Sequence, residues 1–272
     1  MKSILKWSNT IAFFAMVIVN TLANTLPIGG LTTGQVSSKS PTLFTPAPFT
    51  FSIWGVIYLM MGVFVLYQLG TTDTSTNLFN HQDKISVWFI ISCIMNIAWI
   101  FSWHYQKIGF SVLFIVLLLF SLIQINLAMT VEHHTGIGKR ISVYGFNIYL
   151  GWITAATIAN ISVFLKQLNW NRFGLSEQFW TVLIIIVGSF IGVGFVLFSH
   201  RFMSTIAVMW AYFGIFIRHM STGTGNYDQA YPFVIIALAV AFIIMLAFII
   251  LTSVLLSEPN QSDGVIGSSM VK

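Results

Sequence analysis

The sequence predicts an all-α membrane protein with about eight transmembrane helices, each of roughly 20 residues. Three observations support this class. The mean hydropathy is +0.87, only 7% of the residues are charged, and apolar runs long enough to cross a bilayer recur along the chain. Ordinary soluble domains carry about 25% charged residues. A soluble fold of 272 residues could not cover its surface with so few charges.

The apolar runs set the expected positions of the eight helices. They lie near residues 8–26, 50–69, 85–104, 108–130, 142–165, 179–199, 202–218 and 232–256. A stretch rich in proline and glycine separates the first two, and Pro232 opens the last, where its missing N–H does no harm. The first run follows Lys2 and Lys6 as in a signal peptide, but no small-residue cleavage site follows it. We therefore expect a retained first helix.

The distribution of acidic residues excludes several function classes. We expect all of them in loops or in the tail, and no lysine or arginine in the middle of a helix; the acidic residues are Asp73, Asp83, Glu132, Glu177, Asp228, Glu258 and Asp263. Ion-coupled carriers usually need ionisable groups inside the membrane, and hydrolases use paired carboxylates. The lone Cys93 and the scattered histidines show no metal-site spacing. The chain is therefore predicted to be neither an ion-coupled carrier nor a metal protein.

Basic residues in short loops indicate the orientation. With eight spans, seven of the twelve lysines and arginines fall on the side of both termini, and five fall on the other side. Because positive charge is enriched in cytoplasmic loops, we expect both termini inside a multi-pass protein of the cell membrane. The basic residues form no patch, so no nucleic-acid partner is expected.

Neutral polar and aromatic residues inside the spans are the candidate binding residues. They are Trp54 and Tyr58 in the second helix, Asn96 and Trp99 in the third, and Tyr149, Trp152 and Asn160 in the fifth. Spacings of three and four place each set on one helix face. An asparagine in lipid needs a partner across the bundle. Interhelical packing with an interfacial aromatic belt remains open as the alternative.

Three motifs carrying these residues resemble the translocator-protein family, also called the tryptophan-rich sensory proteins (TspO/MBR). Residues 46–62 are similar to its proline-rich loop and second helix, with a Trp, a Tyr-Leu pair and a Met-Gly. Asn96 to Phe101 resembles the Asn-x-x-Trp of its third helix, and Tyr149 to Asn160 resembles its fifth. The motifs come in the family's order. Phe44 or Leu43 stands where the family has a loop tryptophan.

The resemblance implies a fold in three parts. Residues 1–166 would form a TspO-like five-helix bundle, and residues 167–257 an appended segment of three extra helices whose role stays open. We expect residues 258–272, rich in Ser and Gly, to be a disordered tail. The bundle would hold an aromatic pocket lined by the seven candidate residues. A loop stiffened by Pro41, Pro46 and Pro48 would cover this pocket as a lid.

The function implied by the resemblance is binding, sensing or translocation of planar hydrophobic ligands of the tetrapyrrole type. A porphyrin or heme would be the ligand and no cofactor is expected. The alternatives are a small-molecule permease unrelated to tetrapyrroles and a membrane enzyme acting on porphyrin, although we expect no enzyme. The lipid bilayer and a hydrophobic small molecule are the expected partners.

Gly188 and Gly192 leave a homodimer open, with packing inside the chain favoured. Truncation after Gln167 is expected to retain ligand binding.

Overall fold

The computed structural model describes residues 2–26, 28–70, 81–129, 136–199 and 201–257. Within these residues eight helices are long and apolar enough to cross a membrane. The predicted all-α class and the eight spans are therefore confirmed. The expected disordered tail, residues 258–272, lies outside the described residues.

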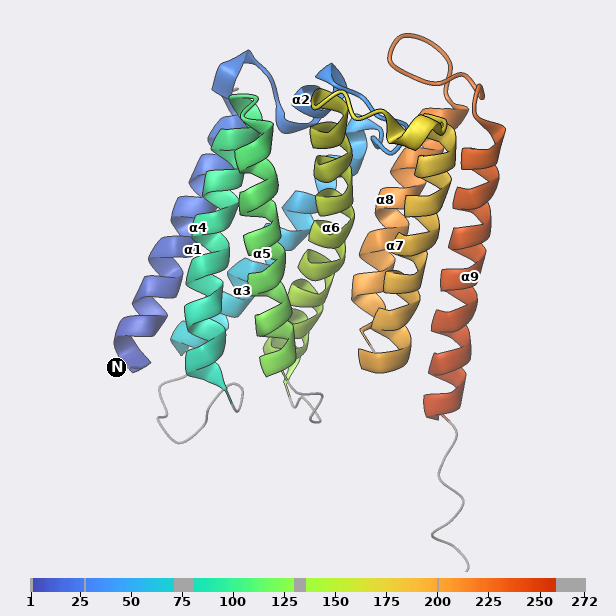
Figure 1. The fold of residues 1–272 in the computed structure, drawn as a ribbon. Coiled ribbons are helices and arrows are strands. Elements are labelled where there is room, and N and C mark those ends of the chain that lie inside the picture. Colours follow the sequence, from blue (N-terminus) through green and yellow to red (C-terminus); the bar gives the residue numbers. More distant parts are fainter. Residues whose placement is uncertain (1, 27, 71–80, 130–135, 200, 258–272) are drawn as a thin grey trace, which may run out of the picture.

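The helices follow the apolar runs closely. Eight are long, and a short one, α2, lies in the connection between the first two spans (Figure 1). Their bounds are α1 Lys2–Thr25, α2 Thr33–Lys39, α3 Ile53–Gly70, α4 Gln82–His104, α5 Ile108–Ala128, α6 Ile137–Gln167, α7 Glu177–Ser199, α8 Phe202–Met220 and α9 Pro232–Ser257. A 3₁₀ turn, η2 (Pro48–Ser52), leads into α3.

Local chemistry explains several helix ends. Thr32 caps α2 and forms a capping box with Gln35, and Pro232 is the first residue of α9, as expected. Asp83 and Glu177 lie in the first turns of α4 and α7. A negative charge there interacts favourably with the positive end of the helix dipole. The expectation that every acidic residue lies in a loop is therefore wrong for these two.

The helices form two neighbouring groups. α1, α3, α4, α5 and α6 pack together, while α7, α8 and α9 pack beside them, and α6 against α8 is the main junction (Figure 1). Each group has its own buried apolar cluster. α1 begins and α9 ends at the same end of the molecule (Figure 1), which agrees with an even number of spans. A domain boundary at 166/167 stays a prediction.

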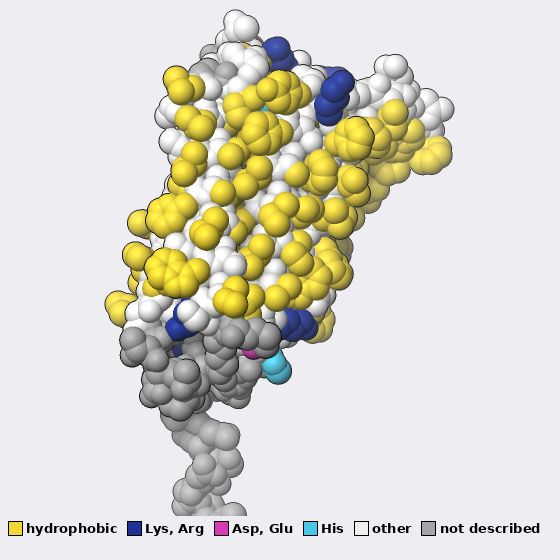
Figure 2. Space-filling model, turned by 90° about the vertical axis from the view of Figure 1, so that its left-hand side faces the viewer, with side chains coloured by type: hydrophobic (Ala, Val, Ile, Leu, Met, Phe, Trp, Pro, Cys, Tyr) yellow, Lys and Arg dark blue, Asp and Glu magenta, His cyan; other side chains and the backbone are white. Residues whose placement is uncertain are grey.

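The outer surface matches a bilayer. Large apolar side chains are exposed on all the spanning helices, among them Leu59, Phe120 and Phe198. Figure 2 shows one face, where an apolar band lies between basic residues at its two ends. Such a surface is typical of a protein in contact with lipid. The chain is a multi-pass membrane protein in contact with the bilayer.

The two glycines of α7 pack inside the chain. A Cβ atom at Gly188 would lie 2.3 Å from the hydroxyl oxygen of Tyr212 in α8. A Cβ atom at Gly192 would lie 2.7 Å from the sulfur of Met245 in α9. These glycines therefore allow close packing of α8 and α9, as favoured from the sequence. Because both glycines pack within the chain, they do not support a homodimer, which stays a prediction.

Candidate ligand-binding site

A small cavity, here called the inner cavity, is lined by residues of α4, α6 and α8 and of the connection between α1 and α3. Its volume is about 40 Å³, enough for only a few water molecules. Its described lining residues are Ser37, Phe44, Thr45, Pro46, Phe51, Trp99, Trp103, Trp152, Ala155, Ala156, Ala159, Asn160, Val163, Ala211 and Ile215. Three alanines of α6 leave this space open, because larger side chains there would fill it.

Two tryptophans of the inner cavity differ in their hydrogen bonding. The indole Nε1–H of Trp99 donates to Asn160 Oδ1 at 3.0 Å, and Asn160 Nδ2 donates in turn to Ser111 Oγ at 2.9 Å. The indole N–H of Trp152 is buried and has no hydrogen-bond partner among the described residues. A buried donor without a partner carries a desolvation cost. An acceptor atom of a ligand that reached this N–H would remove that cost.

A second, more open space, here called the α1–α3 cavity, holds two other candidate residues. Trp54 and Tyr58 line it together with residues of α1, α2 and η2, and its volume is about 500 Å³. Their rings stack with centroids 5.5 Å apart. The indole N–H of Trp54 is also buried and unpaired among the described residues. The candidate residues that line a cavity are thus divided between these two cavities, and a single pocket that they share stays a prediction.

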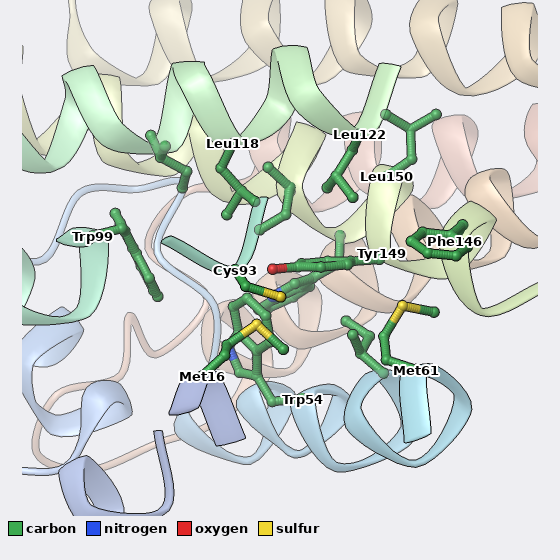
Figure 3. Packing of buried hydrophobic residues seen from close by; sticks show 14 of the residues in the cluster. Met16, Trp54, Met61, Cys93, Trp99, Leu118, Leu122, Phe146, Tyr149 and Leu150 are labelled. Carbon is green, nitrogen blue, oxygen red and sulfur yellow. The ribbon is translucent and has the colours of Figure 1, made fainter. Parts of the chain in front are cut away.

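Asn96 and Tyr149 lie fully buried between these spaces and line neither. Asn96 Nδ2 donates to the Tyr149 hydroxyl at 2.9 Å, and Asn96 Oδ1 accepts from Asn20 Nδ2 at 2.7 Å. Figure 3 shows Tyr149 and Trp54 with Cys93 at the centre of the buried cluster. Asn96 thus finds its partners across the bundle, as a buried amide must in lipid. These contacts link α1, α4 and α6.

The rings of the candidate residues nevertheless form one continuous aromatic wall. The ring centroid of Trp54 lies 5.9 Å from that of Trp99, 5.7 Å from that of Tyr149 and 6.1 Å from that of Trp152. Offset and edge-to-face contacts at such distances stabilise a cluster beyond simple burial. Trp99 and Trp152 of this wall line the inner cavity, and Trp54 lines the α1–α3 cavity.

Residues 41–50, here called the lid segment, close the inner cavity. Pro46 lines the inner cavity, Pro48 lines the α1–α3 cavity, and the Pro41 carbonyl accepts a hydrogen bond from Lys166 Nζ. The Phe44 side chain is buried among residues of α7, α8 and α9. The segment is therefore anchored in the C-terminal helices, and its role as a lid stays a prediction.

Side chains of α8 and of the α8–α9 connection hold the lid segment by its backbone carbonyls. Arg218 Nη1 donates to Pro46 O at 3.2 Å, and His219 Nε2 donates to Leu43 O at 2.9 Å. The Tyr227 hydroxyl donates to Thr42 O at 2.6 Å. Burial raises the pKa of Tyr227 to about 12, so this hydroxyl keeps its proton. Three carbonyls are thus held by three donors.

Further bonds fix the same segment at its amides and in η2. Leu43 N donates to Glu177 Oε1 at 3.0 Å, and Ala47 N donates to Gly214 O at 3.0 Å. The indole N–H of Trp210 donates to Thr50 O at 2.8 Å. The segment is therefore bonded along most of its length to α7 and α8, and the cavity beneath it is closed.

Several residues that line the inner cavity were not predicted as site residues from the sequence. Trp103 lies four residues after Trp99, so the spacing that joined the other pairs would also have found it. Phe44 was noted only as a departure from the loop tryptophan, yet it lines the inner cavity. Ala211 and Ile215 of α8 gave no signal, because their position depends on how α8 packs against α6.

Comparison with known proteins gives one family. A family model described as TSPO-like protein matches residues 6–252, which include all or most of every spanning helix. Neither a curated protein nor a solved structure matches the chain significantly. The match thus extends beyond residue 166, through α7 and α8 and into α9.

Proposed function

The chain belongs to the TSPO-like protein family, and from this premise we propose that it binds a planar hydrophobic ligand of the tetrapyrrole type in the inner cavity. The observation that carries the proposal is the aromatic lining of the inner cavity together with the unpaired indole N–H of Trp152. Aromatic faces offer stacking surface to a planar ring. A few placed polar groups then fix its orientation.

The proposal requires the site to open. Cavities that hold drug-sized ligands measure roughly 300–1,000 Å³, whereas the inner cavity measures about 40 Å³. Phe44, Pro46 and Phe51 reach into this region from the lid segment and η2. We propose that the described arrangement is the closed form, and that the lid segment moves outward to admit the ligand.

Binding is favoured over catalysis by the lining of the inner cavity. Among its described lining residues none is ionisable, and general acid–base chemistry needs a titratable group within hydrogen-bond reach of the reacting atom. We therefore propose a sensor or translocator of the cell membrane and not a porphyrin-degrading enzyme.

A titration of the purified protein in detergent tests the proposal. Protoporphyrin IX, heme and unrelated planar compounds are added while tryptophan fluorescence is followed. We expect saturable quenching by the tetrapyrroles, with weaker affinity in Trp152→Phe and unchanged affinity in Trp180→Phe, whose ring lies outside the inner cavity. Equal quenching by all compounds, or equal affinity in both variants, would contradict a site at Trp152.

A further inference from the structure

A groove between α6 and α7, here called the α6–α7 groove, has no role in the proposed function. Its volume is about 320 Å³, within the range of sites that hold small molecules. Apolar side chains of both helices line its length, among them Ile158, Ile161, Leu165 and Ile184. Phe44 lines both this groove and the inner cavity.

Charged groups lie only at one end of the α6–α7 groove, among its described lining residues. They are Lys166, Arg172 and Glu177. The Glu177 carboxylate accepts a hydrogen bond from Leu43 N, and Lys166 Nζ donates to the Pro41 carbonyl. Arg172 is exposed, and its guanidinium makes no hydrogen bond or ion pair with the described residues. This end therefore carries a net positive charge with one free guanidinium.

Aromatic residues fix that end in place. The rings of Trp170 and Trp180 line the α6–α7 groove with centroids 4.9 Å apart. The indole N–H of Trp180 donates to the backbone carbonyl of Arg172 at 2.9 Å, which holds the α6–α7 connection against α7. Tryptophans concentrate at the headgroup level of a bilayer. We therefore expect the charged end to lie at the depth of the lipid phosphates.

We propose that the α6–α7 groove binds one acyl chain of an anionic phospholipid, with the lipid phosphate at Arg172 and Lys166. Guanidinium groups bind phosphate oxygens through paired hydrogen bonds. The stretch from Ile158 to Lys166 spans about 12 Å at 1.5 Å per residue, so the groove takes the headgroup-proximal part of the chain. Ile161 lines the groove and is exposed on the outer surface of α6, so the groove is expected to be open to lipid. This site is distinct from the inner cavity.

Native mass spectrometry of the full-length protein tests the headgroup contact. The protein in mild detergent is mixed with phosphatidylglycerol or phosphatidylcholine at equal concentration. We expect one phosphatidylglycerol to be retained in preference, and a fall of about 5- to 10-fold in its apparent affinity, roughly 1–1.4 kcal/mol, in Arg172→Gln. Lys107→Gln, an exposed basic residue at the same end of the molecule, should leave retention unchanged. Equal retention of the two lipids, or equal losses in both variants, would overturn the proposal.

A second pair of variants tests the acyl-chain contact. Ile161→Trp fills the α6–α7 groove and should abolish retention of phosphatidylglycerol, whereas Ile123→Trp on the exposed face of α5 should not. Unchanged retention in Ile161→Trp would overturn the acyl-chain assignment. If Ile161→Trp fails to melt cooperatively, the proposal is judged on the retention of phosphatidylglycerol by Arg172→Gln compared with Lys107→Gln. Tetrapyrrole quenching should be normal in Arg172→Gln, so failure of this proposal is separable from failure of the inner-cavity proposal.

Discussion

At the scale of the residue, two tryptophans of the inner cavity differ in the hydrogen bonding of their indole N–H groups. Trp99 and Trp152 both belong to its wall and were both predicted from helix spacing. Among the described residues, only Trp99 of the two has a hydrogen-bond acceptor, Asn160 Oδ1. The spacing could place both rings on inward faces, but it could not show which indole N–H is already paired, because the partner lies 61 residues away in the sequence.

Replacing each tryptophan by phenylalanine should separate an effect on ligand affinity from an effect on folding stability. Trp152→Phe removes an unpaired donor, so ligand affinity should fall by about 0.5–1.5 kcal/mol with little change in Tm. Trp99→Phe leaves Asn160 Oδ1 buried without its donor, which should cost about 1–3 kcal/mol of folding free energy and lower Tm. Fluorescence titration and thermal melts check both. Similar Tm values for the two variants would contradict this assignment.

A single glycine sets how closely the lid approaches α8. A Cβ atom at Gly214 would lie 1.9 Å from Thr50 Oγ1, and the Gly214 carbonyl accepts the hydrogen bond from Ala47 N. Gly214→Ala should therefore push η2 and the lid segment away from α8. We expect faster hydrogen exchange at Ala47 and a lower Tm.

Gly194→Ala is the matched control for that variant. Its new Cβ atom would meet only Phe198, at an ordinary contact distance of 3.8 Å. Exchange at Ala47 should stay at the wild-type rate. Equal exchange rates in the two variants would show that the fit at Thr50 does not control the lid.

At the scale of the element, the lid segment depends on helices far away in the sequence. Its prolines predicted a stiff cover, but its partners come from α6, α7, α8 and the α8–α9 connection, and Leu43 and His219 lie 176 residues apart. Two residues of α8, Ala211 and Ile215, also line the inner cavity. The inner cavity is therefore not confined to residues 1–166. Truncation after Gln167 would remove part of its wall, so we no longer expect it to preserve binding.

Weakening the hydrogen bonds that attach the lid segment to α8 should speed ligand entry. Arg218→Gln removes a charged donor from the Pro46 carbonyl, and a hydrogen bond to a charged group contributes about 1.5–3 kcal/mol. If the lid segment must open first, the open population should rise by about 10- to 100-fold. Stopped-flow quenching should then show a faster association rate. An unchanged rate would indicate that ligand enters by another route.

At the scale of the whole molecule, the sequence predicted the spans better than the site. Long apolar runs bounded by Pro and Gly determine where a helix can cross a bilayer, so every span lies within a few residues of its expected position. The division of the aromatic residues between two cavities was not predictable. It depends on how Phe51, Trp54 and Trp152 pack in three dimensions, and helical spacing gives only the face of each separate helix.

Introduced cysteines can test the topology without removing the native one. Cys93 is fully buried and should not react with a membrane-impermeant maleimide. Lys39→Cys and Lys84→Cys place exposed thiols at opposite ends of the bundle. In intact cells only one of them should react, and with cytoplasmic termini it is the cysteine at position 39. Labelling of both would contradict the eight-span topology.

The attachment of the lid segment by its carbonyls bears on how this protein can change over evolutionary time. Every residue type offers the same backbone oxygen, so the side chains of Thr42 and Leu43 can be exchanged without losing the bonds to Tyr227 and His219. The donors have no such freedom, because only a few side chains can reach and donate. Among descendants of this sequence, the donor residues His219 and Tyr227 should therefore vary less than Leu43 and Thr42, whose carbonyls accept.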